Sequence, residues 1–104
     1  MAVTPFTPQN AATVNIDISS SNQRVKYSND GFSQQVRVMN NGTATAWIAF
    51  GDVTITAALA TGIPVGPGVT EVYSITSTPG TSLYAAAIAA GSTGKIYFTP
   101  GVGN

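Results

Sequence analysis

The stretch Gln34-Gln35-Val36-Arg37-Val38-Met39-Asn40-Asn41-Gly42-Thr43-Ala44-Thr45-Ala46-Trp47-Ile48-Ala49-Phe50 decides the fold class of this 104-residue chain. Two runs in which apolar and polar side chains alternate flank the tripeptide Asn40-Asn41-Gly42. Alternation with a period of two is typical of half-buried β-strands, and asparagine followed by glycine is typical of a turn between paired strands. The stretch therefore predicts a β-hairpin with strands at 34–39 and 43–50.

The register of this hairpin follows from comparing two loop lengths. A three-residue loop at 40–42 separates polar and apolar side chains onto different faces better than a two-residue loop, and Gly42 provides the left-handed residue that such a loop needs. A slip by one residue would exchange the two faces, so burial of the apolar face selects the register. This register directs one set of side chains into the core: Val36, Val38, Ala44, Ala46, Ile48 and Phe50. It leaves Trp47 on the outward face beside Gln35 and Arg37.

The same alternation predicts further strands near 13–19, 23–27, 70–75, 82–90 and 95–99, and thus about seven short β segments. The run Tyr84-Ala85-Ala86-Ala87-Ile88-Ala89-Ala90 conflicts with this pattern because alanine is the strongest helix former. Glycines 80 and 91 bound a segment too short for a stable helix, so we expect a strand here. Segments 53–56 and 63–65 could add short edge strands within the long connection 53–69. The chain is predicted to be all-β.

The chain length corresponds to one domain. Two prolines three residues apart, Pro5 and Pro8, predict an extended N-terminal arm over residues 1–10, because proline fixes φ and disfavours helix. The folded domain is then expected over residues 11–99, and residues 100–104 are expected to form a C-terminal tail without regular structure. The first residues have neither the basic nor the apolar region of a signal peptide, and no segment has the roughly 20 apolar residues that a membrane span needs.

Charge is scarce in this sequence. Four basic and four acidic residues give a net charge of zero, and only 8% of the residues are charged, against about a quarter in ordinary globular domains. Four scattered cations cannot form a phosphate-binding surface, so we expect no nucleic acid partner, and we expect no membrane partner. A neutral surface rich in serine and threonine is typical of a subunit that works in an assembly, or of a secreted β domain.

The sequence contains no histidine and no cysteine, so nucleophile–base pairs and thiolate or imidazole metal sites have no candidates. The four carboxylates lie on separate predicted strands and turns, which leaves no pair positioned for acid–base catalysis. Asn29-Asp30-Gly31 has too few oxygen ligands for a calcium site, and no glycine-rich stretch ends in the Gly-Lys-Ser/Thr of a phosphate loop. We therefore expect no catalytic residue, no metal site and no cofactor, and the chain is predicted not to be an enzyme.

Three stretches resemble a group of small virion structural proteins of tailed bacteriophages and prophages. They are residues 36–52, Gly68-Val69-Thr70-Glu71-Val72-Tyr73 and Tyr97-Phe98-Thr99-Pro100-Gly101, and the resemblance covers about residues 34–104. It implies a two-layer antiparallel β-sandwich, immunoglobulin-like or jelly-roll-like, of about seven strands. It further implies a protein of the virion, assembled in the host cytoplasm, that binds the phage head as a cement (decoration) protein.

On this basis the expected partners are the phage major capsid protein and further copies of the chain in a homo-oligomer. Phe6, Arg37 and Trp47 are the candidate interface residues, since aromatic and arginine side chains are enriched at interface centres. Trp47 could equally lie under a loop or on a second sheet of its own domain. Two alternatives remain open: a structural subunit of the tail or head–tail connector, and a carbohydrate-binding or host-adhesion module of the virion surface that stacks sugars on Trp47 and tyrosines.

Overall fold

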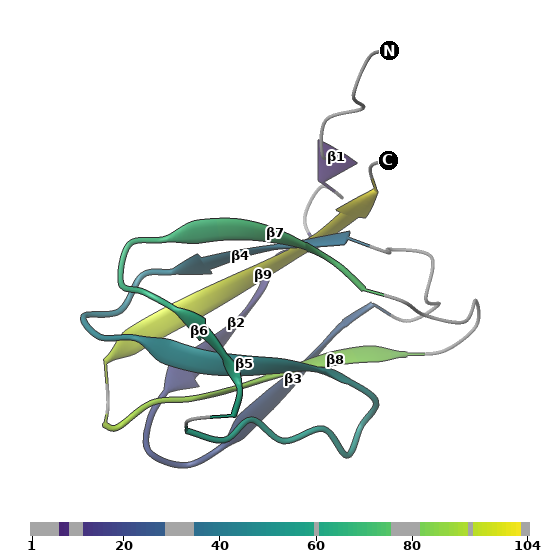
Figure 1. Ribbon diagram of the computed structural model, residues 1–104. Helices are drawn as coiled ribbons and strands as arrows, with labels where there is room; N and C mark the ends of the chain where they lie inside the picture. Colours follow the sequence, from purple (N-terminus) through teal and green to yellow (C-terminus); the bar gives the residue numbers. More distant parts are fainter. Residues whose placement is uncertain are drawn as a thin grey trace.

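The computed structural model describes residues 7–8, 12–28, 35–59, 61–75, 82–91 and 93–102. Two antiparallel sheets pack face to face, one above the other in Figure 1, and the described residues contain no helix. The first sheet (sheet A) contains β1 (Thr7–Pro8), β2 (Val14–Ile18), β4 (Gln35–Asn40), β7 (Thr70–Ser74) and β9 (Gly94–Val102). The second (sheet B) contains β3 (Gln23–Ser28), β5 (Ala46–Gly51), β6 (Ile63–Val65) and β8 (Leu83–Ile88). The predicted all-β sandwich is confirmed, with eight strands and the two-residue segment β1 rather than about seven.

The strand pairing identifies the topology. β2 pairs with β9, β3 with β8, β4 with β7 and β5 with β6, every pair being antiparallel. Strands are thus paired in nested order from the two ends of the chain, as in one long hairpin rolled into two layers. The pairing of β4 with β9 and of β5 with β8 completes the two sheets. Their strand orders are β2-β9-β4-β7 and β3-β8-β5-β6. This arrangement is the jelly roll, one of the two sandwich types that we expected.

The predicted hairpin between residues 34–39 and 43–50 is wrong. β4 and β5 belong to different sheets, and residues 41–45 carry the chain from one sheet to the other. Val36 and Val38 nevertheless face Ala46 and Ile48 across the sandwich, and all four are fully buried. Ala44, predicted to be in the core, is exposed because it lies in this crossing.

The core combines large side chains from both sheets with a row of small ones on and beside β8. Phe98 lies fully buried and packs edge-on against the ring of Phe50, whose centroid is 6.2 Å away. Sheet B contributes Ala85, Ala87 and Ala89 on the facing side, each fully buried. The alanine-rich segment therefore forms strand β8, as expected, because small side chains leave room for the rings and branched side chains opposite them.

At one end of the sandwich, on the left in Figure 1, loops that connect the two sheets are hydrogen-bonded to one another. The backbone N–H groups of Asn41 and Thr43 donate to the carbonyl oxygens of Lys95 and Thr93 at 2.9 and 2.8 Å. Asn40 is fully buried at this end; its amide donates to the carbonyl oxygens of Ala44 and Val65 and accepts from the Gly42 N–H. The turn expected at residues 40–42 is thus a buried junction of three connections.

The ends of the described chain differ from the expectation. β9 continues to Val102, so residues 100–102 are strand rather than tail, and Thr7 and Pro8 of the predicted arm pair with Val102 and Gly101 (Figure 1). β6 confirms the short strand at 63–65, whereas 53–56 is not a strand. Phe6 and the turn residues 29–31 lie outside the described residues.

Candidate functional surfaces

The outward face of sheet B is covered by the connection from β5 to β6, of which residues 52–59 and 61–62 are described and are named here the roof loop. Its first turn forms where Asp52 accepts hydrogen bonds from the backbone N–H and the hydroxyl of Thr54 at 2.9 and 2.6 Å. These two bonds are the main reason why the pKa of Asp52 lies below its ordinary value, since they stabilise the carboxylate.

Two side chains of sheet B and its neighbouring turn attach the roof loop to the sandwich. Arg24 Nη1 donates to the carbonyl oxygen of Ile55 at 2.9 Å, and the Ala57 N–H donates to Asn22 Oδ1 at 2.7 Å. Arg24 pairs across the strands with Ala86, which points outward from β8 yet is fully buried. The loop, held by Arg24, therefore replaces solvent over the outer side of sheet B.

Beyond Asp52 the roof loop is uncharged, and its exposed side chains are threonines and apolar residues. No charged residue occurs from Val53 to Thr70. Within the described part of the roof loop, Val53 and Leu59 keep 56 and 45% of their surface exposed. Large apolar side chains exposed on an uncharged segment are typical of surfaces that contact another protein.

Trp47 lies on the outward side of β5, between its strand partners Pro64 and Ile88. It is half-buried beside the end of the roof loop, where a Cβ on Gly62 would approach the Trp47 Cβ to 2.9 Å. This placement is the one that we considered under a loop of the same domain. The expected position of Trp47 beside Gln35 and Arg37 is wrong, because β4 and β5 lie in different sheets.

The outward face of sheet A has a different character, because side chains of three strands and of two residues next to strands surround a shallow hollow of about 600 Å³ on it. Tyr97 and Thr99 come from β9, Arg37 and Met39 from β4, and Thr70 from β7, while Thr13 and Asn41 lie just outside their strands. The hydroxyls of Thr13 and Thr99 are hydrogen-bonded to each other at 2.9 Å. Met39 is 41% exposed, and Arg37 is exposed with its own polar contacts.

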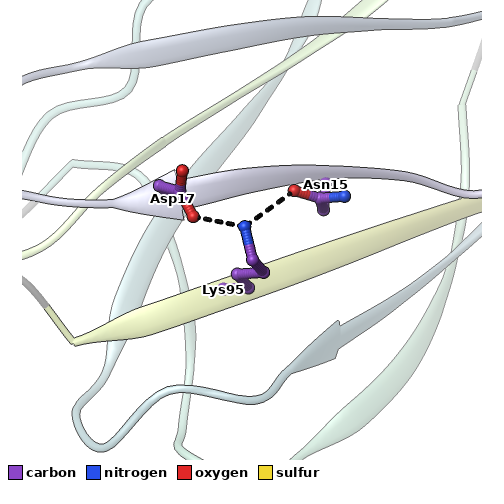
Figure 2. A network of polar contacts seen from close by, with 3 residues as sticks. All are labelled: Asn15, Asp17 and Lys95. Atoms are coloured by element: carbon purple, nitrogen blue, oxygen red, sulfur yellow. Dashed lines mark hydrogen bonds and ion pairs between the residues drawn. The ribbon is translucent and has the colours of Figure 1, made fainter.

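An ion pair lies on the same face next to the hollow. Lys95 Nζ donates to Asp17 Oδ1 at 2.6 Å and to Asn15 Oδ1 at 3.5 Å, as Figure 2 shows. The hydrogen bond to Asp17 and the charge of that carboxylate raise the pKa of Lys95 above its ordinary value. The pair cancels one positive and one negative charge, so this part of the face stays close to neutral.

The structure places the three predicted interface residues apart. Phe6 lies outside the described residues, while Arg37 and Trp47 lie on the two opposite outer faces of the sandwich. The hollow was not predicted from the sequence, although the alternation of Ile96 and Phe98 with Tyr97 and Thr99 is a signal that Tyr97 and Ile96 point to opposite faces. The missing information was that β4 lies beside β9, which brings Met39 opposite Tyr97.

In the part of the chain that the structure describes, no three acidic, histidine or cysteine side chains come together as metal ligands. The described residues also include no helix long and apolar enough to cross a lipid bilayer. No protein-family model, curated protein or solved structure matches this chain. The resemblance to phage virion proteins therefore stays a prediction.

Proposed function

We propose that the chain is a structural protein of a phage virion, a cement protein that binds the assembled lattice of the major capsid protein through the roof loop. The observation that carries the proposal is the uncharged part of the roof loop after Asp52, with its exposed apolar side chains Val53 and Leu59. The jelly roll supports it as an architecture of viral capsid proteins, although the same fold also occurs in lectins and cupins.

Three edge strands, β3, β6 and β7, support docking through a face rather than through strand addition. β6 is three residues long and contains Pro64. β3 carries the exposed Arg24 and Lys26 and an irregular register between Lys26 and Ser28. In β7, Glu71 pairs with the buried Val38 and so points a charge toward the core side of the edge. Short length, proline, irregular register and inward charge each hinder pairing with a further strand.

Binding to the assembled shell stabilises it by mass action, because the bound state exists only when the lattice is intact. Each occupied site contributes about 2.7 kcal/mol when the free protein is at about 100 times its Kd. A surface of few charges suits this role, since little charge has to be desolvated when the roof loop is buried.

The test is to titrate the purified protein onto phage heads that were assembled without it, and to follow bound protein and the temperature at which the heads rupture. Saturating protein is expected to raise the rupture temperature. Leu59→Lys is expected to abolish binding, whereas Met39→Lys is the matched control, because Met39 is similarly exposed but lies on the opposite face. An unchanged rupture temperature at saturation, or equal loss of binding in both variants, would contradict the proposal.

The tail or head–tail connector remains the alternative place for the same subunit. Virions labelled at the C-terminus of this chain and imaged by negative-stain electron microscopy would separate the two. Label over the capsid surface supports the cement role, and label at the tail replaces it with the alternative. Sedimentation of the free protein measures the expected homo-oligomer.

A further inference from the structure

The hollow on the outer face of sheet A has no role in docking through the roof loop, which lies on the other side of the sandwich. Its volume of about 600 Å³ falls in the range of about 300–1,000 Å³ that is typical of small-molecule sites. Tyr97 is half-buried there, between its strand partners Asn15 and Met39. An aromatic ring next to an exposed thioether gives this polar face an apolar centre.

The surrounding groups are of the kind that can both donate and accept hydrogen bonds. Thr13, Thr70 and Thr99 contribute hydroxyls, and Asn41 contributes an amide. A hydroxyl donates one hydrogen bond and accepts others, and an amide does both from adjacent atoms. Sugar hydroxyls have the same dual character, so this lining can satisfy them in several orientations.

We propose that this hollow binds a neutral glycan, with a pyranose ring stacked on Tyr97 and its hydroxyls bonded to the surrounding threonines and Asn41. The C–H groups on one face of a pyranose carry a slight positive charge, which complements the negative face of an aromatic ring. The Met39 side chain flanks the ring and excludes water from its edge.

The charges on this face favour a neutral ligand over an anionic one. Lys95 is paired with Asp17 at 2.6 Å, and Arg37 already has polar contacts of its own. A phosphate or polyanion would need several available cations, which this face does not offer among its described residues. The open shape admits part of a longer glycan chain, since the hollow is shallow and extends across three strands.

The sequence suggested stacking on Trp47 and on tyrosines that were not specified; this site uses Tyr97 and not Trp47. Trp47 belongs to sheet B and is half-buried beside Gly62. The glycan site is also independent of the capsid role, because the two use opposite faces. Either can fail without the other.

The experiment is a titration of the ¹⁵N-labelled full chain with four neutral trisaccharides, namely maltotriose, cellotriose, triacetylchitotriose and mannotriose, each to about 10 mM. At least one is expected to shift the backbone amide signals of Tyr97, Met39 and Asn41 in a saturable way. The fluorescence of Trp47, the one tryptophan, is expected to stay constant during the same titration. Absence of a saturable shift with all four sugars would overturn the proposal.

Two substitutions locate the site. Tyr97→Ala is expected to weaken binding by about 10-fold or more, since the stacked ring is removed. Tyr97→Phe keeps the ring and is expected to bind within a few-fold of the unaltered chain; thermal unfolding of both variants shows that they fold. Sugar binding that survives Tyr97→Ala, or that shifts Trp47 instead, would place the glycan elsewhere and refute the assignment.

Discussion

Replacement of Asn40 by alanine is expected to cause one of the largest losses of stability that a single side chain of this protein can give. The Asn40 side chain is fully buried and makes three hydrogen bonds, to the carbonyl oxygens of Ala44 (3.0 Å) and Val65 (2.9 Å) and from the Gly42 N–H (2.8 Å). The bond to Val65 is buried, whereas the other two are partly accessible to water.

The magnitude follows from what each partner loses in Asn40→Ala. The Val65 carbonyl is left without a partner in the interior, which costs about 1–3 kcal/mol, and the two partly accessible bonds contribute about 1 kcal/mol each. The sum is about 3–5 kcal/mol, a large fraction of the roughly 5–15 kcal/mol that holds an ordinary domain folded. A loss of about 3 kcal/mol corresponds to a fall in Tm of about 12–24 °C for a chain of this size.

Urea unfolding of Asn40→Ala, followed by circular dichroism, measures this loss directly. Asn41→Ala is the matched control, since Asn41 is exposed and its replacement should change the free energy of unfolding by no more than about 0.5 kcal/mol. Asn40→Asp tests the donors separately, because it keeps the shape and can still accept from Gly42, but it turns a carboxylate toward two carbonyl oxygens. If Asn40→Ala unfolds within about 1 kcal/mol of the unaltered chain, the side chain does not join the three connections as argued.

Three further predictions concern single positions. Gly94→Ala should lower the free energy of unfolding, measured by urea titration, by about 2–4 kcal/mol. Gly94 has a φ of +128°, and an added Cβ would lie 2.9 Å from Gly42 Cα. Gly91→Ala is the control in the same titration, because no atom lies within 4 Å of its added Cβ. Tyr27→Phe should raise stability by about 1 kcal/mol, because the buried Tyr27 hydroxyl has no hydrogen-bond partner among the described residues. Burial raises the pKa of Tyr27 to about 12. The contribution of neutral Tyr27 to stability is therefore complete below pH 10 and is lost as the pH rises from about 10 to 12. Tyr27→Phe should remove this part of the alkaline loss of stability. Asp17→Asn should return the raised pKa of Lys95 to its ordinary value, as followed by NMR of its side chain. On the alkaline side, the contribution of this pair to stability disappears as the pH rises from 10.5, the unfolded pKa of Lys95, through its higher folded pKa. An unchanged Lys95 titration in Asp17→Asn would show that the ion pair does not form in solution.

The sequence predicted which side chains point inward, because alternation depends only on the chain itself. Val36, Val38, Ala46 and Ile48 were expected in the core and are fully buried there. Alternation does not say which strand lies beside which. In a sandwich the inner faces of both sheets are apolar, so two strands on opposite sheets satisfy the same pattern as two strands of a hairpin.

The prediction of a hairpin turn at Asn40-Asn41-Gly42 was wrong for a second physical reason. Asparagine and glycine favour tight turns by their local conformations, and the sequence shows only that local preference. In the structure the Asn40 side chain bonds to Gly42 and Ala44 nearby, but also to the Val65 carbonyl 25 residues along the chain. The backbone of Asn40 bonds to that of residues 68–69. The bonds to residues 65–69 leave no signal in the turn residues themselves.

The candidate surfaces could be predicted only in part for the same reason. The uncharged segment 53–70 is visible in the sequence, but its position over sheet B depends on Arg24 and Asn22, which hold it from another strand and turn. Similarly, the outward direction of Tyr97 follows from the period of its strand. Its place next to Met39 follows only from the β4–β9 pairing.

The roof loop has two sides with different physical roles, and this constrains any study of its function. Its inner side contributes to folding, because Ala57 is buried and Ala86 would be exposed without the cover that Arg24 holds in place. Its outer side carries Val53 and Leu59, which keep 56 and 45% of their surface exposed and so add less to the folded domain than a buried side chain does. Deletion of the loop would therefore confuse loss of folding with loss of docking. Substitutions of Val53 and Leu59, compared with one of the buried Ala57, separate the two roles: only the first set should reduce binding to the capsid while changing the free energy of unfolding little.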